Sequence, residues 1–197
     1  MSNQLIDPFG RSVEYIRLSV TDRCDLRCFY CLPGDYRDFQ EPEEWLSFGE
    51  IERVIRAFAS LGVQRVRVTG GEPLVRKNLP ALVTQLAGIQ GIEDLSLSTN
   101  AVSLARQAKD LKTAGISRIN VSLDSLRPER FKDITRGNLD KVMNGLMTAK
   151  AAGFSPIKIN MVVMKDVNDD EVEDMLEFCI EHDFTLRFIE TMPVGDT

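Results

Sequence analysis

The chain has 197 residues, of which 43% are hydrophobic and 27% are charged. This composition excludes intrinsic disorder, and the sequence contains no run of 18 apolar residues that would indicate a membrane span. The formal net charge of −6 excludes the broad basic surface of proteins that bind nucleic acid or anionic lipid, so any basic site must be local.

The first residues show no export signal. Residues 1–10 lack a basic segment followed by an apolar stretch and a small-residue cleavage site. We therefore expect a cytoplasmic protein, in which thiols stay reduced and a tight cysteine cluster binds metal more often than it forms disulfides. No linker rich in Pro, Gly or Ser divides the sequence, so residues 1–197 are expected to form one domain.

Short β-branched segments alternate with helical patterns along the chain, which is typical of parallel βαβ units. In chain order, strands are predicted over residues 15–20, 65–69, 94–99, 117–123, 157–164 and 185–190. Helices are predicted over residues 47–61, 79–87, 104–114, 139–152 and 169–182. Ser47 and Glu50 have the spacing of a capping box at the start of the first helix, and Gly62 follows its end.

All six predicted strands alternate between polar and apolar residues, as in RVRVT and INVSL. Parallel strands with both faces covered by helices are instead nearly continuous apolar runs. An antiparallel sheet with one solvated face is an alternative, although helical crossovers argue against it. We predict an α/β fold: an incomplete (β/α)6 barrel of parallel strands, with helices outside and a polar lumen, because a complete barrel fills its interior with apolar side chains.

Several basic residues occupy the polar positions of these strands. They are Arg17, Arg65, Arg67, Lys158 and Arg187. Like charges packed into a low-dielectric space repel one another unless a ligand neutralises them. Each is also compatible with an ordinary surface or ion-paired role, but together the alternating positions indicate a polyanionic ligand.

Three of the four cysteines, Cys24, Cys28 and Cys31, lie in CDLRCFYC, directly after the first predicted strand. Ligands bind at this end of the strands in parallel α/β folds. A disulfide would leave one thiol unpaired, and a structural zinc site normally requires four Cys or His ligands. Thiolates also hold iron–sulfur clusters, usually four for a 4Fe–4S cube, so three would leave one iron open.

The remaining cysteine and the single histidine lie far along the chain. Cys179 is in the apolar helical stretch MLEFCI and is expected to be a buried core thiol. His182 is expected to place a favourable charge at the end of the same helix. Neither is predicted to be a metal ligand.

The segment TGGEP, residues 69–73, closes the second predicted strand. Glycines allow positive φ and a close approach of backbone to a ligand. Exposed backbone carbonyls or Glu72 would accept hydrogen bonds from an ammonium group. Taken alone, a segment of this kind is more often a simple turn than a ligand-binding segment.

Together, CxxxCxxC and TGGEP resemble the radical S-adenosylmethionine superfamily. The resemblance implies that the three cysteines ligate a 4Fe–4S cluster whose open iron binds S-adenosylmethionine. It further implies that an electron from an unidentified donor cleaves S-adenosylmethionine to a 5′-deoxyadenosyl radical.

A closer resemblance runs along nearly the whole chain. RLSVTDRCDLRCFYC, RVTGGEPLVRK, INVSLDSL, IKINMVVMKDVNDDE and LRFIETMPVG resemble the N-terminal part of the GTP 3′,8-cyclase family. This resemblance implies a lyase that abstracts hydrogen from C3′ of GTP and joins C3′ to C8, the first step of molybdenum cofactor biosynthesis. It allows a homodimer and implies neither nucleic acid nor membrane as a partner.

The same resemblance implies roles for individual residues. S-adenosylmethionine would be contacted by Tyr30, Gly70, Gly71, Glu72, Ser122 and Met192. GTP would be contacted by Arg17, Arg67, Ser98, Lys158 and Arg187.

Two departures from the family pattern change what we expect. Ala101 stands where the family commonly has glycine in TNG, so the local backbone is expected to differ. The sequence ends at Thr197, before the segment that holds a second cluster in the family, so we expect S-adenosylmethionine cleavage without cyclised product. The alternatives are a radical S-adenosylmethionine enzyme with another substrate and a non-catalytic, zinc-stabilised nucleotide-binding domain.

Overall fold

The computed structural model describes residues 4–31, 36, 39 and 45–190. In this part of the chain, six parallel strands form one sheet in the sequential order β1-β2-β3-β4-β5-β6. The strands are β1 (Tyr15–Ser19), β2 (Arg65–Thr69), β3 (Asp94–Thr99), β4 (Ile116–Ser122), β5 (Ile157–Val163) and β6 (Thr185–Glu190). Each predicted strand is present, with bounds that differ by no more than one residue, and the antiparallel alternative is wrong.

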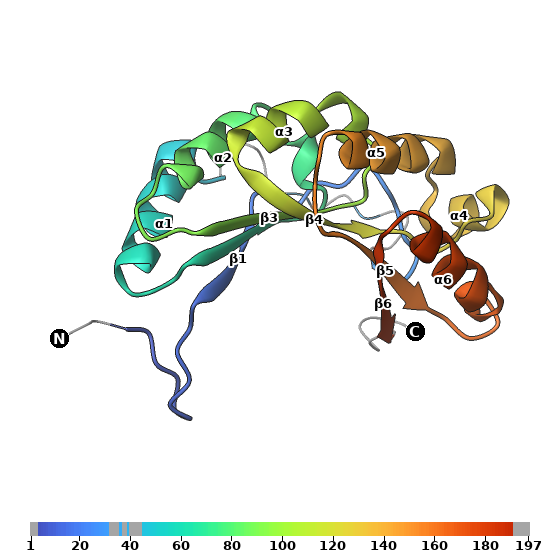
Figure 1. The fold of residues 1–197 in the computed structure, drawn as a ribbon, viewed down its shortest axis with the longest axis horizontal. Coiled ribbons are helices and arrows are strands. Elements are labelled where there is room, and N and C mark those ends of the chain that lie inside the picture. The colour runs from blue at the N-terminus through green and yellow to red at the C-terminus, as the bar shows by residue number, and fades with distance from the viewer. Residues whose placement is uncertain (1–3, 32–35, 37–38, 40–44, 191–197) are drawn as a thin grey trace.

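The helices lie along the outer, convex side of the curved sheet (Figure 1). They are α1 (Phe48–Ser60), α2 (Leu79–Ala87), α3 (Ala108–Ala114), α4 (Pro128–Thr135), α5 (Leu139–Ala151) and α6 (Val172–Glu181). Short 3-10 turns are η2 (Pro73–Val75), η3 (Leu104–Arg106) and η4 (Asp169–Glu171). Strands β1 and β6 form the two edges and do not pair with each other, so the sheet is the predicted incomplete barrel.

The apolar residues that alternate along the inner strands, β2 to β5, form the core beneath the helices. Val66, Val68, Leu97, Ile119, Val121 and Ile159 are all fully buried. Because successive side chains on a strand point to opposite faces, the polar residues between them face the concave side of the sheet. The core therefore directs the polar and charged positions away from the helices.

Three helix predictions differ from the structure. The helix predicted over 104–114 is divided into η3 and α3 at Gln107, whose side chain donates a 3.1 Å hydrogen bond to the carbonyl of Leu74. The helix predicted over 169–182 begins as η4 and continues as α6. Helix α4 was not predicted; Pro128 occupies its first turn, and Phe131 and Ile134 are its buried anchors.

The predicted capping box is confirmed. The Ser47 hydroxyl accepts from the backbone N–H of Glu50, and the Glu50 carboxylate accepts from the backbone N–H of Ser47. In the described ranges, no helix is both long and apolar enough to cross a bilayer.

Candidate functional site

The cysteine loop, residues 20–31, follows β1 at the carboxyl edge of the sheet. Cys24 and Cys28 are half-buried, Cys31 is exposed, and all three are free thiols. The backbone N–H groups of Arg27 and Phe29 donate to the carbonyls of Thr135 and Ile134 at 2.8 and 3.1 Å. The end of α4, a helix the sequence did not reveal, thus supports the loop from one side.

The glycines of TGGEP pack against the base of this loop. The N–H of Gly71 donates to the Thr21 carbonyl and the N–H of Glu72 to the Arg23 carbonyl, both at 2.8 Å. A Cβ added at Gly70 would lie 2.3 Å from the Thr21 carbonyl oxygen, and one at Gly71 would lie 2.4 Å from that of Arg23. Only glycine allows these two backbone segments to approach so closely, so the two motifs form one unit.

Glu72 is buried beneath this unit. Its carboxylate accepts from Leu74 N at 3.0 Å, from Thr99 Oγ1 at 2.7 Å and from Asn100 N at 2.6 Å. Burial raises the pKa of Glu72 to about 7, although the three donors oppose the shift. In this structure the side chain therefore links the end of β2 to the turn after β3.

That turn also contacts the cysteine loop. Asn100 Nδ2 donates to Asp25 Oδ1 at 2.6 Å and lies 3.8 Å from Cys24 Sγ. Ala101 has φ 62°, so the backbone keeps the left-handed conformation that a glycine would favour, and the expected local difference does not occur. The contact of Asn100 could not be inferred from the sequence, where 75 positions separate it from Asp25.

Tyr30 reaches from the loop to the end of β4. Its hydroxyl donates to Asp124 Oδ2 at 2.7 Å, and Asp124 Oδ1 accepts from Val162 N at 2.9 Å. Burial raises the pKa of both Tyr30 and Asp124. Asp124 was not predicted as a site residue, and its position in INVSLDSL, two residues after Ser122, is the signal that was available.

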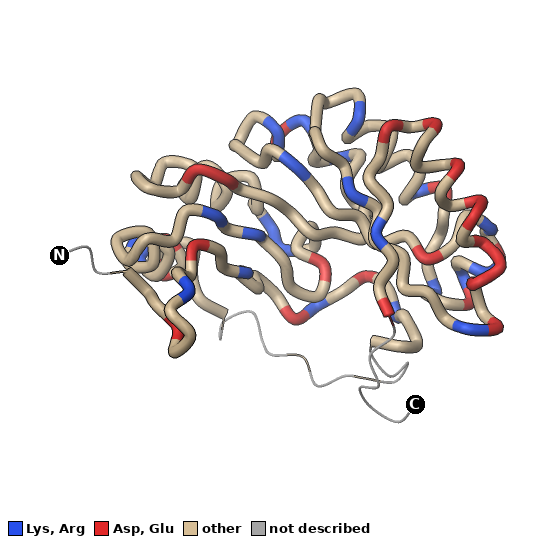
Figure 2. The backbone as a smooth tube through the Cα atoms, turned by 60° about the horizontal axis from the view of Figure 1, so that its bottom comes forward, with Lys and Arg blue, Asp and Glu red and all other residues tan. Residues whose placement is uncertain are grey.

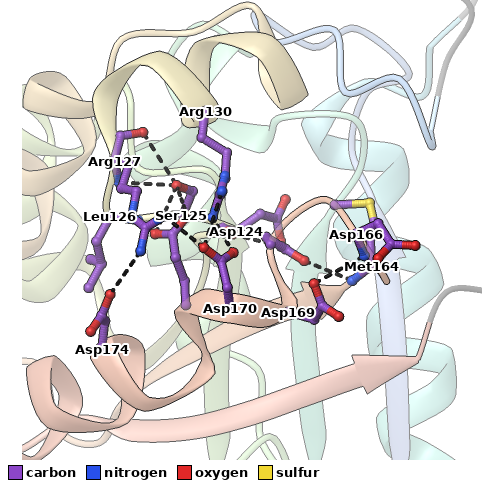
Figure 3. A network of polar contacts seen from close by, with 12 residues as sticks. Asp124, Ser125, Leu126, Arg127, Arg130, Met164, Asp166, Asp169, Asp170 and Asp174 are labelled. Carbon is purple, nitrogen blue, oxygen red and sulfur yellow. Dashed lines mark hydrogen bonds and ion pairs between the residues drawn. The ribbon is translucent and has the colours of Figure 1, made fainter.

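A polar network holds the loops after β4 and β5 together beside Asp124 (Figure 3). The carboxylate of Glu171, fully buried, accepts from Ser125 Oγ, from Leu126 N and from Arg130 Nη1 at distances of 2.7 to 3.0 Å. Asn168, also fully buried, donates to the Asp124 carbonyl at 2.8 Å. The NDDE segment thus has a structural role next to the site.

Basic residues lie on neighbouring strands of the concave face (Figure 2). Arg17 pairs in register with Arg67, Arg67 with Ser96, and Ser96 with Arg118, while Lys158 lies on β5. Because side chains in one register row share a face, these cations converge there.

The electrostatics agree with this placement. Burial lowers the pKa of Arg67, and the positive charges of Arg118, Arg187 and Arg17 lower it further. The pKa of Lys158 is lowered by burial and then by the charges of Arg187, Arg118 and Arg67. The charged forms of Arg67 and Lys158 are therefore less stable here than in water. A bound anion would stabilise these charged forms.

The predicted set of cations requires two changes. Arg65 does not join the cluster, because at the amino end of β2 it pairs with Glu14 at 3.4 Å and both side chains are half exposed. Arg118, which was not predicted, does join it. Arg118 alternates with Ile119 and so shares a face with Asn120 and Ser122, which the sequence could have indicated, and it also forms an ion pair with Asp94.

Four other residues singled out in the sequence differ in burial, and one of them lies outside the described residues. Ser98 is half-buried on β3, and Ser122 is exposed at the end of β4. Met192 lies outside the described residues. Cys179 is buried in α6, as expected, and burial raises its pKa to about 11.

The chemistry of the three thiols is compatible with an iron–sulfur cluster. In the part of the chain that the structure describes, no group of three or more His, Cys, Asp or Glu is placed to hold a metal ion. A cube distributes its thiolate ligands over several irons and therefore needs no such group around one ion. Burial raises the pKa of Cys28 to about 12, so iron binding must supply the charge that deprotonates it.

The comparisons with known proteins agree with this geometry. Residues 18–179 match the family model of the radical SAM superfamily. The chain belongs to the radical SAM superfamily. Membership implies a 4Fe–4S cluster and S-adenosylmethionine as cofactors.

Curated relatives of this radical SAM protein confirm the closer resemblance. The GTP 3′,8-cyclase of Hydrogenovibrio crunogenus is 53% identical over 98% of this chain, and that of Ectopseudomonas mendocina is 51% identical over 98%. The chain spans 59% of the length of each relative. The match therefore covers only part of those proteins.

Solved structures show the same fold. SuiB of Streptococcus suis, bound to its precursor peptide SuiA, matches with a TM-score of 0.77 and 20% identity over 91% of this chain and 39% of its own. The enzyme anSMEcpe with bound AdoMet matches with a TM-score of 0.74 and 19% identity over 93% of this chain and 53% of its own. At these identities the comparison supports the partial-barrel fold alone.

Proposed function

We propose that this protein is a radical S-adenosylmethionine lyase that acts on GTP, as a GTP 3′,8-cyclase. The observation that carries the proposal is the row of cations on the concave face, which lies on the same sheet whose carboxyl edge holds the cysteine loop. A triphosphate is the kind of polyanion that would neutralise these charges.

The three thiols of Cys24, Cys28 and Cys31 would hold the cluster. When bound, the cluster would supply the electron for reductive cleavage of S-adenosylmethionine, the chemistry needed to remove hydrogen from C3′ of GTP. The backbone N–H of Leu26 donates to Cys24 Sγ at 3.4 Å, which orients that sulfur and stabilises it as a thiolate.

The residues that the family resemblance assigns to S-adenosylmethionine would bind it. They are Tyr30, Gly70, Gly71, Glu72, Ser122 and Met192. The hydrogen bond to Asp124 fixes the ring of Tyr30 against the end of β4. Since the Glu72 carboxylate already accepts three hydrogen bonds, its part in this site is to hold the TGGEP backbone in place for the methionine ammonium.

Arg17, Arg67, Ser98, Lys158 and Arg187 would bind GTP. Arg67 is braced by Ser96 Oγ, 3.4 Å from its Nε, and lies over the ring of Tyr15. These contacts limit the conformational entropy that Arg67 loses when a phosphate binds. We further expect a cytoplasmic location, an unidentified electron donor, no nucleic-acid or membrane partner, and a homodimer as one allowed assembly.

The test compares two arginines on one strand. Arg67→Ala should weaken GTP binding about tenfold or more, because it removes a partly buried phosphate contact. Arg65→Ala is the matched control, since Arg65 shares the strand and the face but pairs with Glu14, and it should leave GTP binding unchanged. Equal effects, or no GTP binding by the parent protein, would contradict the proposal.

The hydrogen-transfer step has its own experiment. GTP deuterated at C3′ is mixed with the reconstituted protein, S-adenosylmethionine and a reductant, and 5′-deoxyadenosine is analysed by mass spectrometry. Deuterium in the product is expected. Its absence, with 5′-deoxyadenosine still formed, would indicate another substrate.

A further inference from the structure

Asn120 occupies a central place on the concave face. It lies on β4, directly between Ser98 on β3 and Lys158 on β5 in the register of the sheet. Both neighbours are half-buried, whereas Asn120 is only 2% exposed. A ligand that contacts both neighbours must cross Asn120, because adjacent strands are about 4.8 Å apart.

The amide of Asn120 lacks a partner. Its Nδ2, a hydrogen-bond donor, is buried and has no acceptor among the residues that the structure describes. On the next strand Asn160, which pairs with Ser122 and Arg187, has a buried Oδ1 that is equally unpaired. An unpaired donor and an unpaired acceptor thus lie on adjacent strands of one face.

Such groups are costly and therefore informative. Buried amides are nearly always hydrogen-bonded, because an unpaired one loses its contacts with water and gains nothing in return. An apolar residue of similar shape would remove the cost. Polar groups that break this rule on a ligand-binding face are expected to gain their partner from the ligand.

We propose that Asn120 is a further substrate-binding residue, whose side-chain N–H donates to a phosphate or sugar oxygen of the bound nucleotide. This inference rests on the proposed function. Asn120 lies between Ser98 and Lys158, the two residues proposed to bind GTP, so GTP is the ligand expected to contact it. Ser122, proposed to bind S-adenosylmethionine, lies two residues further along β4, nearer the carboxyl edge of the sheet. The unpaired Oδ1 of Asn160 lies on the same face, beside Arg187 in the register of β5 and β6.

The test uses Asn120→Leu in the anaerobically reconstituted protein. Leucine has nearly the shape of asparagine but no donor, so the unfolding midpoint without ligand should equal or exceed that of the parent. The Kd for GTP should rise about tenfold, the usual effect of losing one hydrogen bond to a charged partner. The Kd for S-adenosylmethionine should not change.

Two more variants complete the design. Asn120→Ala also lacks the donor, but unlike Asn120→Leu it leaves a cavity. If both variants lose GTP affinity to the same extent, the loss is caused by the missing amide and not by changed packing. Asn144→Ala, at an exposed position on α5, is the control and should bind GTP as the parent does. Inorganic triphosphate as a second probe identifies the contact: a parallel loss indicates a phosphate oxygen, and a loss for GTP alone indicates a sugar oxygen.

Four results would overturn the inference. If Asn120→Leu is destabilised and still binds GTP normally, the amide serves the fold through a bound water. If only S-adenosylmethionine binding weakens, the residue serves the co-substrate. If the parent binds GTP and Arg67→Ala weakens it while both Asn120 variants do not, the proposed function stands and the Asn120 assignment fails; absence of GTP binding by the parent would overturn both.

Discussion

The hydroxyl of Tyr30 is hydrogen-bonded to Oδ2 of Asp124 at 2.7 Å, so a residue between Cys28 and Cys31 is anchored to the end of a strand 94 positions away. Asp124 also accepts from the backbone of Val162, and so joins the cysteine loop, β4 and β5. One carboxylate therefore fixes the relative positions of the loop and the sheet.

Replacing Asp124 with alanine tests this anchor. The change leaves two partly buried donors, Tyr30 O–H and Val162 N–H, without an acceptor, which should lower the free energy of unfolding by about 2–4 kcal/mol. Asp124→Asn retains an oxygen for Val162 and an NH2 for the tyrosine oxygen, so its loss should be clearly smaller. Urea unfolding of the reduced, cluster-free protein measures both, and equal stability of Asp124→Ala and the parent would show that the anchor is unimportant.

Gly71 tests the contact between the two motifs. In Gly71→Ala the new methyl would lie 2.4 Å from the Arg23 carbonyl oxygen and 2.6 Å from that of Asp22, so the backbone beside Cys24 must move. We expect a loss of stability of about 3 kcal/mol and a lower iron and sulfide content after anaerobic reconstitution.

Gly49→Ala is the control for this substitution. Gly49 lies in α1 with nothing within 4 Å of an added Cβ, so alanine there should stabilise the protein by about 0.5–1 kcal/mol and leave the iron content unchanged. Full iron loading of Gly71→Ala would contradict the close packing of TGGEP on the cysteine loop.

The buried carboxyl of Glu72 should produce a pH dependence of stability. Its folded pKa of about 7 lies above the ordinary value of 4.5, so the folded protein holds this proton more tightly than the unfolded chain does. The stabilisation is therefore complete below about pH 4.5, falls by about 3 kcal/mol as the pH rises to about 7, and is constant above that.

Comparison with Glu72→Gln isolates this contribution. The free energy of unfolding of the cluster-free parent, minus that of the variant, should fall between pH 4.5 and 7 and then level off. A difference that stays constant or rises over this range would show that the carboxyl is ionised throughout.

Two neighbouring arginines should differ in their contributions to stability. Arg130 pairs with the fully buried Glu171 at 2.7 Å, so Arg130→Ala leaves a buried carboxylate without its counter-ion and should cost about 3 kcal/mol. Arg127 pairs with Asp170 and Asp174, whose side chains are about half exposed, and Arg127→Ala should cost less than about 1 kcal/mol. Thermal unfolding of the two variants checks the contrast, and similar losses would argue against it.

The strands and the cationic face could be predicted because alternation is a local property of the sequence. The same rule would have indicated Arg118, which alternates with Ile119 on β4, but it could not show that Arg65 pairs with Glu14, which precedes β1. The helix predicted over 104–114 is divided at Gln107, whose side chain is hydrogen-bonded to the distant Leu74 carbonyl, a contact that a local pattern does not reveal.

The supporting residues of the site could not be predicted for a related reason. Two of these residues, Asp124 and Asn100, are hydrogen-bonded to residues of the cysteine loop that are distant in sequence. A third, Asn120, stands out because its buried amide has no partner among the described residues. Spacing along the chain identifies the cysteines, but it carries no information about which buried carboxylate or amide will lie opposite them in the fold.

The most direct test of the central claim is the formation of 5′-deoxyadenosine from S-adenosylmethionine by the anaerobically reconstituted and reduced protein. We expect the parent and Cys179→Ser to form it, since Cys179 is buried in α6, and Cys24→Ser, Cys28→Ser and Cys31→Ser to form none. Formation of 5′-deoxyadenosine at the parent's rate by any of these three variants would contradict the assignment of the cysteine loop as the cluster site.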